Sequence, residues 1–458
     1  MATIPNKISW SEDDSTWCGV QVMAWADALA RHTDHPEHLS CTYLTPAHQA
    51  AAQTLMQWMR EAGFDTVRQD AIGNLIARYE AAGIDGVRGA GSSTHVNVGQ
   101  GSGDASVTAN ADTGNAAAAP PCVVVGSHYD TVHNGGRYDG RLGILLPLAI
   151  VKRLHARGER LPVDLELVAF SEEEGVRYGG TFLGSSAYAG IFDAAQLDRV
   201  DADGIPMHAA IAAAGLQVEQ IALAQADVAR MQHYFEVHIE QGPVLLDRGL
   251  PVGVVSAIAG SIRRRITLTG RASHSGTTPM DMRLDAACAA AEIILLVERR
   301  CADIPGLVGT VGQLSVPNGS VNVIPGRCIF SLDVRADNDA TRDAALADID
   351  LGIAEILTRR GITAEQEELM RVPAVPCSPE QRSMWLDAIA ATGIPAIELP
   401  SGAGHDAMMM ANVVPVSMLF VRCGNGGISH NPREIVDVAD VTIAASVTME
   451  FLARLTRD

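Results

Sequence analysis

The chain has 458 residues, of which 47% are hydrophobic, and its formal net charge at pH 7 is −20. This acidic net charge argues against nucleic acids, which proteins bind with a basic face, and against anionic membranes, so we expect neither as a partner. The length predicts two domains, and the longest apolar stretches, such as residues 144–151, are too short to cross a bilayer. Residues 1–20 lack the apolar core of a signal peptide and the eight cysteines form no tight framework, so we expect a cytoplasmic protein with reduced thiols.

The first part of the chain predicts two helices followed by two strands. Residues 22–30 and 47–62 have the apolar spacing of helices, and Gly63 follows the second as a C-cap. Residues 66–79 alternate like strands around a turn at Gly73. Residues 83–120 are rich in small and polar residues, which predicts a flexible surface insertion.

The next part predicts an open α/β sheet. Residues 122–125 form a short apolar run typical of a buried parallel strand, residues 140–154 resemble a helix, and residues 163–170 resemble the next strand. Polar motifs follow both strands directly. In open α/β sheets, functional sites form at the carboxyl ends of the strands.

A second folding unit is predicted from a change of pattern near residues 258–260. Its elements are strands at 266–268, 309–314 and 328–335 and helices at 285–298 and 341–358. The first unit resumes near Pro373, with elements at 384–391, 413–420 and 436–456. The predicted fold class is therefore α/β, with a discontinuous domain over 1–257 and 374–458, containing a mixed or parallel sheet flanked by helices. An α+β domain over 258–373 is inserted into it.

Five side chains of the kinds that bind divalent metals stand in separate local motifs. They are His128 in GSHYDT, Asp139 in GGRYDGRLG, Glu174 in SEEEG, His238 in EVHIEQG and His430 in GGISHNP. Three imidazoles and two carboxylates suit a pair of Zn, Mn, Co or Ni ions that share one carboxylate. Two such ions about 3.5–4 Å apart activate a water and polarise a carbonyl together. The set predicts a hydrolase with two divalent metal ions per subunit.

Several of these residues also have a purely structural interpretation. His128 alone could be a buried histidine with a local hydrogen bond, and Asp139 precedes a predicted helix that it could cap. The acids at 172–174 could form a solvated charged face. Asp130 lies two residues after His128, where a carboxylate would orient the imidazole.

The chain contains eight short motifs in this order: GSHYDT, DGRLG, SEEEG, HIEQG, SHSGTTPM, NVIPG, SGAGHDA and ISHNP. The whole ordered set is a far more specific signal than any one motif. Together they resemble the hydantoinase/carbamoylase branch of the M20 metallopeptidase-like family, over nearly the whole chain from about Gln21 onward. That branch contains N-carbamoyl-L-amino acid amidohydrolases, allantoate amidohydrolases and ureidopropionase-like enzymes. The resemblance implies that the inserted domain is a lid and dimerisation domain of a homodimer. The family usually has a much shorter link in place of residues 83–120.

The resemblance also implies roles for the acids and for one distant histidine. Asp139 becomes the bridging ligand, Glu173 the general base and Glu174 a metal ligand, which leaves Glu172 peripheral. Gln241 becomes a polar contact of the substrate. His274 would hydrogen-bond the oxygen that becomes negative during the reaction, and it would do so in the active site of the partner subunit.

Further residues are assigned to the substrate by the same resemblance. Asn322 and Arg335 match a pair that binds the substrate carboxylate, and an arginine fork suits a carboxylate. An ion pair with Asp333 or Asp337 is the structural alternative for Arg335. Small residues where backbone can approach the substrate are Gly402, Ala403 and Gly404. His405 has no assigned role.

The expected reaction is hydrolysis of a terminal carbamoyl C–N bond in a small ureido substrate that carries a carboxylate. An N-carbamoyl-L-amino acid is the first choice and allantoate the alternative, because the two kinds of enzyme share every motif quoted. An M20 aminopeptidase or dipeptidase is disfavoured by HIEQG and by the pair Asn322 and Arg335. A metal-stabilised scaffold is disfavoured by Glu173, since a structural metal site needs ligands but no base.

Overall fold

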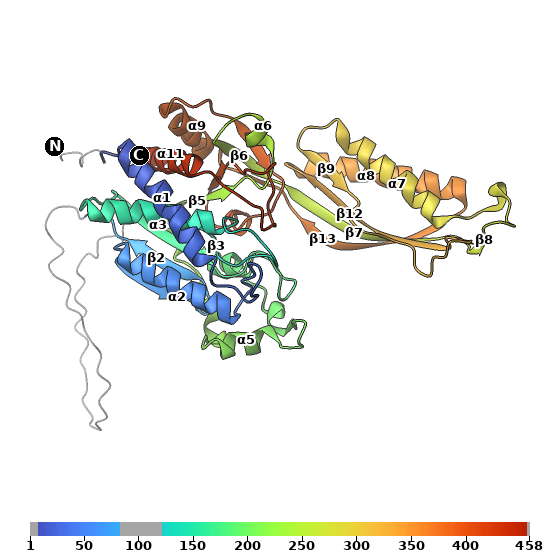
Figure 1. The fold of residues 1–458 in the computed structure, drawn as a ribbon, viewed down its shortest axis with the longest axis horizontal. Helices are drawn as coiled ribbons and strands as arrows, with labels where there is room; N and C mark the ends of the chain where they lie inside the picture. The colour runs from blue at the N-terminus through green and yellow to red at the C-terminus, as the bar shows by residue number, and fades with distance from the viewer. Residues whose placement is uncertain (1–7, 83–120, 456–458) are drawn as a thin grey trace, which may run out of the picture.

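The computed structural model describes residues 8–82 and 121–455. The predicted insertion at 83–120 lies outside the described residues. Figure 1 shows an elongated molecule, in which a broad unit of sheet and helices continues into a narrower extension of long strands and two helices. In the described ranges, no helix combines the length and the apolar character needed to cross a membrane.

The broad unit contains a mixed sheet with the strand order β1-β2-β4-β3-β5-β16-β6-β14, in which β15 also pairs with β6. Its strands are β1 (Thr66–Gln69), β2 (Leu75–Tyr79), β3 (Cys122–His128), β4 (Asp164–Phe170), β5 (Met231–Ile239), β6 (Val252–Ile258), β14 (Val375–Pro376), β15 (Glu398–Ser401) and β16 (Val416–Val421). The central strands β4, β3, β5 and β16 are parallel neighbours. Their carboxyl ends therefore meet at one edge of the sheet.

Both faces of this sheet are covered, as its continuous apolar strands predict. Val123 and Val125 of β3 pack into a core with helices α1 (Glu12–Leu29), α2 (Pro46–Glu61), α3 (Arg141–Ala156), α9 (Pro379–Ala391) and α11 (Val438–Leu455). Val124 points the other way, into a core with α4 (Leu183–Tyr188) and α10 (Ala407–Met410). Shorter helices are α5 (Met207–Ala213), α6 (Val244–Asp247) and 3₁₀ turns at Ala194–Asp198, Val218–Ala224, Val228–Arg230 and Met280–Met282.

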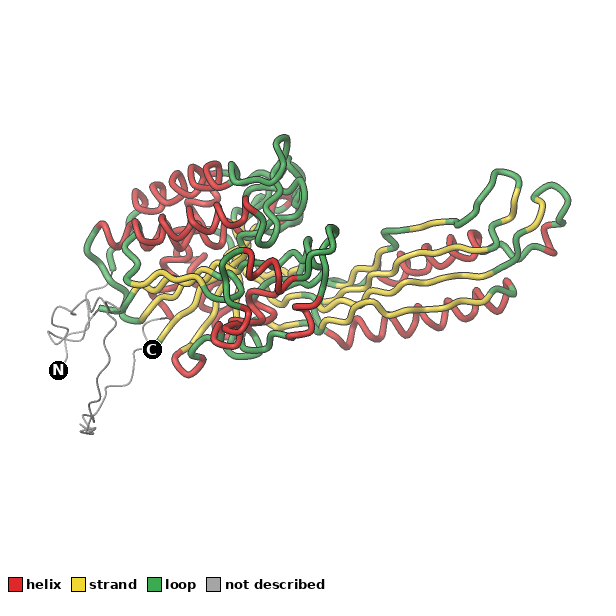
Figure 2. The backbone as a smooth tube through the Cα atoms, turned by 90° about the horizontal axis from the view of Figure 1, so that it is seen from below, coloured by secondary structure: helices red, strands yellow, loops and turns green. Residues whose placement is uncertain are grey.

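The extension is built on a separate antiparallel sheet with the order β10-β12-β7-β13, and β9 also pairs with β12. These strands are β7 (Gly260–Thr269), β9 (Leu307–Thr310), β10 (Leu314–Ser315), β12 (Arg327–Ala336) and β13 (Thr363–Val372). Helices α7 (Ala286–Ala302) and α8 (Asp339–Arg360) share a core with one face of the sheet. The short strands β8 (Ser273–His274) and β11 (Val323–Ile324) pair at the far end (Figure 1). Figure 2 shows the long strands running side by side along the extension.

The predicted fold class, a mixed α/β sheet with helices plus a separate α+β unit, is confirmed. Several elements differ from the prediction, and two of them have a clear physical reason. Helix α1 begins at Glu12 rather than at residue 22, because Ser11 and Asp14 form a capping box that starts the helix earlier. Strand β13 was not predicted, since its sequence TAEQEELMRV has almost no buried side chain and therefore no apolar alternation.

Candidate active site

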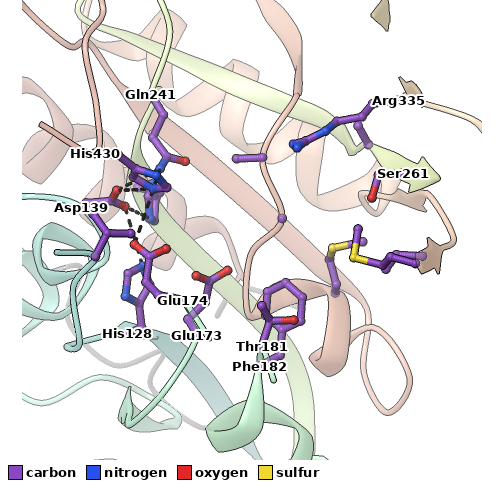
Figure 3. A pocket seen from close by; sticks show the side chains of 18 of the residues that line it. His128, Asp139, Glu173, Glu174, Thr181, Phe182, Gln241, Ser261, Arg335 and His430 are labelled. Atoms are coloured by element: carbon purple, nitrogen blue, oxygen red, sulfur yellow. Dashed lines mark hydrogen bonds and ion pairs between the residues drawn. The ribbon is translucent and has the colours of Figure 1, made fainter. Parts of the chain in front are cut away.

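The five candidate metal ligands His128, Asp139, Glu174, His238 and His430, the metal-type residues, converge at the carboxyl edge of the mixed sheet. His128 is the last residue of β3, Glu174 follows β4, and His238 lies near the end of β5. Asp139 stands just before α3, and His430 lies in the loop that leads to α11. Figure 3 shows His128, Asp139, Glu174 and His430 together on one side of a pocket, although they span some 300 residues of sequence.

Asp139 lies at the centre of this cluster. Its Oδ1 is 3.2 Å from His238 Nε2 and 3.7 Å from His128 Nε2, and its Oδ2 is 3.1 Å from His430 Nε2. Glu174 Oε1 lies 3.5 Å from the same nitrogen of His430. The described residues contain four sets of possible donor atoms, each with its atoms within 4.8 Å. Two contain Asp139, namely His128, Asp139 and His238, and Asp139, Glu174 and His430, and a third joins His128 to Glu173 and Glu174. Asp139 belongs to the first two sets, as a bridging ligand must.

The donor chemistry fits divalent cations. Asp139 Oδ1 is buried, yet it accepts no well-directed hydrogen bond from any residue in the described ranges. Burial would raise the pKa of Asp139, but the close imidazole rings of His128, His238 and His430 hold it well below its usual range. The Asp139 carboxylate raises the pKa of His430 to about 9, whereas burial and the Asp139 charge raise the pKa of Glu174 to about 7. Close-packed carboxylates and imidazoles of this kind are consistent with a metal site.

Asp130 connects two parts of the cluster. Its Oδ1 lies 3.2 Å from His128 Nδ1, the ring nitrogen that faces away from Asp139. Its carboxylate also accepts the backbone N–H groups of Glu173 and Glu174, at 3.2 Å each. A carboxylate in this position fixes the orientation of an imidazole and raises its basicity.

Gly140 allows the turn that brings Asp139 to the histidines. Its φ angle is +65°, and an added Cβ would lie 2.4 Å from the ring of His128. The backbone N–H of Gly140 is 3.1 Å from His238 Nε2. Gly140, not Asp139, occupies the N-cap position of α3, so helix capping does not explain Asp139.

Glu172, which was expected to be peripheral to the chemistry, does not line the cavity but is not a surface residue either. Its side chain is fully buried, and neither carboxyl oxygen has a hydrogen-bond partner in the described part of the chain. Burial, followed by the charge of Asp130, raises the pKa of Glu172 well above its usual range. The acids at 172–174 therefore do not form a solvated face, because the chain turns inward after the buried strand β4.

A cavity of about 330 Å³ joins the cluster to the inserted unit. From the broad unit it is lined by the five metal-type residues, Glu173, Gln241, Ala403 and Gly404, and from the extension by Ser261, Arg263 and Arg335. Gly402 lines the adjoining groove, where its carbonyl oxygen accepts a hydrogen bond from Arg335 Nη1 at 2.7 Å. Arg335 also forms the ion pair with Asp333 that was its structural alternative. Arg335 thus belongs both to the ion pair and to the pocket wall (Figure 3).

His274 and Asn322 are not in this cavity. The backbone N–H of Ser275 donates to the Asn322 carbonyl oxygen at 3.0 Å, and His274 pairs in register with Val323, so both residues lie at the far end of the extension (Figure 1). The expected pairing of Asn322 with Arg335 is therefore wrong within one subunit. Strand β12 explains the separation, since its ten extended residues span about 33 Å and Arg335 is near its other end.

Gln241 contacts the metal-type residues themselves. Its Nε2 lies 3.0 Å from Asp139 Oδ2 and 3.3 Å from His430 Nε2. His405 is buried, with its Nε2 2.8 Å from Ser401 Oγ and its ring 4.5 Å from that of His238. Burial and the charge of His238 lower the pKa of His405 far below its usual range, so the ring is neutral. His405 thereby links the loop at 402–404 to the histidine cluster.

Several residues of the site were not predicted. Glu434 is buried and accepts hydrogen bonds from the backbone of Asp139 and from Ser429, and Ser429 also donates to Asp139 Oδ2. The acid in SHNPRE, four residues after His430, was a signal that could have been used. Arg263 and Phe182 carry no local signal, because they reach the cavity only through tertiary packing.

Comparisons with known proteins agree with this geometry. Residues 124–454 match Peptidase family M20/M25/M40. An N-carbamoyl-L-amino acid amidohydrolase from Geobacillus stearothermophilus is 36% identical over 88% of this chain and 90% of its own length. An allantoate deiminase from Arabidopsis thaliana is 35% identical over 94% of this chain and 81% of its own length.

Among solved structures, a hydantoinase/carbamoylase family amidase from Burkholderia multivorans has a TM-score of 0.82 at 30% identity, covering 96% of this chain and 98% of the other. The relatives divide between two substrates but share one reaction class. The chain belongs to the M20/M25/M40 peptidase family, in its hydantoinase/carbamoylase branch, and is a hydrolase that acts on C–N bonds other than peptide bonds.

Proposed function

We propose that this chain hydrolyses the carbamoyl group of an N-carbamoyl-L-amino acid. One water is consumed, and the free amino acid, ammonia and carbon dioxide are released. The observation that carries the proposal is that one cavity is lined by the metal-type residues, by the buried acid Glu173 and by Arg335. A ureido group at the cluster and a carboxylate at the arginine are the two ends of such a substrate.

The metal cluster is proposed to hold two divalent ions, Zn, Mn, Co or Ni, through His128, Asp139, Glu174, His238 and His430. When bound, such ions lower the pKa of a water and polarise the carbonyl to be attacked. Asp130 holds the His128 ring, and Gln241 and Ser429 each donate to Asp139 Oδ2. These contacts keep the ligands in position before substrate arrives.

Glu173 is proposed as the general base. Burial raises the pKa of Glu173 well above its usual range, and the charges of Glu174 and Asp406 add to the rise, while His128 partly offsets it. A carboxylate with a raised pKa takes a proton from the attacking water more readily. Glu173 then passes that proton to the departing nitrogen.

The remaining substrate contacts are proposed to come from two subunits. Arg335 and the backbone at 402–404 hold the carboxylate end from the same chain. His274 and Asn322 share the tip formed by β8 and β11, so a chain that brings one of them to a partner's cavity brings both. This supports a homodimer formed through the inserted unit, with His274 hydrogen-bonding the developing oxyanion in the partner's site.

The lining of the cavity favours a substrate with an apolar side chain. Phe182, Met370, Val372 and Met408 line the same cavity as Glu173. Burial of an apolar side chain against them contributes favourable free energy, whereas the second ureido group of allantoate would lose water there. Thr181 and Ser261 add hydroxyl groups to the same cavity, and these keep allantoate as the second candidate.

The test is ammonia release from a panel of substrates by protein stripped of metal and then reloaded with Zn, Mn, Co or Ni. The panel contains N-carbamoyl-L-amino acids with apolar and polar side chains, ureidopropionate, allantoate and a dipeptide. We expect the highest kcat/KM for N-carbamoyl-L-amino acids with apolar side chains. Turnover of the dipeptide without turnover of any ureido compound would contradict the proposal, and Glu173→Gln serves as the inactive control.

A further inference from the structure

The residue that precedes the three acids is held on both sides by buried side chains. Ser171 follows β4, and its backbone N–H donates to Asn74 Oδ1 at 3.0 Å. Its carbonyl oxygen accepts a hydrogen bond from His48 Nε2 at 2.7 Å. All three residues are buried. Once the chain has left the strand, two side chains thus replace the neighbouring strand as partners of its backbone.

Asn74 connects the acid segment, residues 171–174, to two other segments. It lies in the turn between β1 and β2, where Asp70 accepts its backbone N–H at 2.8 Å and its Nδ2 at 2.9 Å. The same Nδ2 donates to the carbonyl oxygen of Gly184, in the first turn of α4, at 2.9 Å. Asn74 therefore fixes the acid segment relative to α4, which follows the cavity residue Phe182.

His48 connects the acid segment to the chain that follows β3. It lies in the first turn of α2, and its ring stacks on Tyr129 with the ring centroids 4.3 Å apart. Tyr129 stands between His128 and Asp130 in the chain. Burial lowers the pKa of His48 to about 4, although the charge of Asp130 opposes this, so the ring is a neutral donor at neutral pH. His48 thus contacts the residues that follow both β3 and β4.

The positions of two acids at the cavity depend on this segment. The cavity lining includes Glu173 and Glu174 but neither His48 nor Asn74. Asp130 accepts the backbone N–H groups of both acids at 3.2 Å, so it holds the end of the segment while His48 and Asn74 hold its start. Figure 3 shows the two carboxylates beside His128. Misplacement of a reacting group by about 1 Å can lower turnover about 100-fold.

We infer that His48 and Asn74 are positioning residues, which set the places of Glu173 and Glu174 through the backbone of Ser171. The inference rests on the proposed function, because it takes Glu173 as the general base and Glu174 as a metal ligand. It assigns a part in the reaction to two buried side chains of the N-terminal segments, about 100 residues before the acids in sequence.

The test separates the hydrogen bond of His48 from its packing. His48→Phe keeps a ring against Tyr129 and removes the donor, whereas His48→Gln keeps a donor at the position of Nε2 and removes the ring. In metal-loaded His48→Phe we expect kcat for N-carbamoyl-L-leucine to fall about 10- to 100-fold, as for other losses of an outer contact. The KM should stay within about threefold of wild type, and His48→Gln should restore most of the lost kcat.

Hydrogen exchange gives a readout that needs no substrate. The N–H groups of Ser171, Glu173 and Glu174 are hydrogen-bonded, so the acid segment should exchange slowly in wild type and faster in His48→Phe. Binding of one of the two metal ions should also weaken about 10- to 100-fold, measured by competition with a chelator. Asn74→Ala should change kcat, exchange and metal affinity in the same direction, and it decides the matter if His48→Phe does not fold.

His32→Phe is the matched control. His32 Nε2 lies 2.8 Å from Thr54 Oγ1 of α2, so the change removes a histidine hydrogen bond of similar length outside the acid segment. We expect kcat, exchange of the acid segment and metal affinity to match wild type.

Three results bear on what would fail. A lower thermal midpoint of His48→Phe with unchanged kcat and exchange would show a purely structural role and overturn the inference. A kcat of His48→Gln as low as that of His48→Phe would overturn it too, since the donor would not be the cause. No ammonia from any ureido substrate with wild-type protein would overturn the proposed function instead, and exchange and metal affinity would still test the inference.

Discussion

The carboxylate of Glu434 accepts a hydrogen bond from the backbone N–H of Asp139 at 3.2 Å, across 295 residues of sequence. It also accepts the N–H of Tyr138 at 2.8 Å. A Cβ on Gly136 would lie 2.1 Å from this carboxylate, so only a glycine lets the loop approach so closely. The loop that carries His430 thus holds the loop that carries Asp139.

Glu434→Ala should weaken metal binding without unfolding the chain. The change leaves two backbone donors beside Asp139 without their acceptor, and loss of such an outer contact typically lowers metal affinity 10- to 100-fold, by about 1–3 kcal/mol. Competition with a chelator measures the affinity. Glu365→Ala, at an exposed position of β13, is the control, and equal affinities in the two variants would contradict the prediction.

The assignment of the two neighbouring acids is tested by Glu173→Gln and Glu174→Gln. Both acids lie in one donor set with His128, but Glu174 also approaches His430 at 3.5 Å. We expect Glu173→Gln to lose about 10²–10⁴-fold in kcat with its metals retained, as for loss of a general base. Glu174→Gln should lose one metal ion, counted by elemental analysis. The opposite pattern would exchange the two roles.

Removal of metal should abolish activity and leave most of the fold intact. The apolar cores behind both sheets do not depend on the metal-type cluster, so helical circular dichroism should be retained in chelated protein. The thermal midpoint should fall, because the ions stabilise the folded state that binds them. Full turnover by protein shown to be metal-free would refute the proposed two-metal mechanism.

The action of His274 in a partner subunit is tested by mixing two inactive variants. His274→Ala and Glu173→Ala should each be nearly inactive alone. After the two are unfolded and refolded together in equal amounts, half the dimers should be mixed and each should have one complete site, which restores about a quarter of wild-type activity. Mixed dimers that form and stay inactive would show that His274 does not act in the partner's site.

Asp14 should contribute to stability in a pH-dependent way. It is buried, and although burial raises its pKa, hydrogen bonds with Ser11 and the charges of Arg153 and Arg157 lower it to about 2. Because the folded-state pKa lies below the unfolded value, the stabilisation is complete above about pH 4 and is lost as the pH falls through 2. Asp14→Asn should therefore cost up to about 2 kcal/mol at neutral pH. Urea unfolding at pH 7 and pH 3.5 should show a smaller difference at the lower pH.

The ligand cluster was predictable because each of its motifs follows a buried strand or stands next to one. Parallel strands bring their carboxyl ends to one edge, so His128 and Glu174 had to meet there. By the same reasoning, Glu172 should have been expected inside, since the chain that leaves β4 is still in the core. The Ser171 carbonyl there bonds to the buried His48 at 2.7 Å.

The parts of the site that escaped prediction depend on contacts between distant segments. Arg263 meets Asp333 across 70 residues, and Glu434 meets Asp139 across 295, so no local pattern marks either pair. Conversely, Asn322 and Arg335 are close in sequence and were expected to act together. The extended strand between them places them at opposite ends of the inserted unit.

The position of β16 has a consequence for how the chain reaches its native state. This strand lies between β5 and β6, parallel to the first and antiparallel to the second, yet it follows the entire inserted unit in sequence. During synthesis β5 and β6 are therefore made before the strand that separates them, and this part of the sheet can be completed only when β16 inserts between them. Such non-local pairing folds slowly and leaves unpaired strand edges exposed in the meantime. The half-made sheet, rather than the finished enzyme, is the species most prone to aggregate.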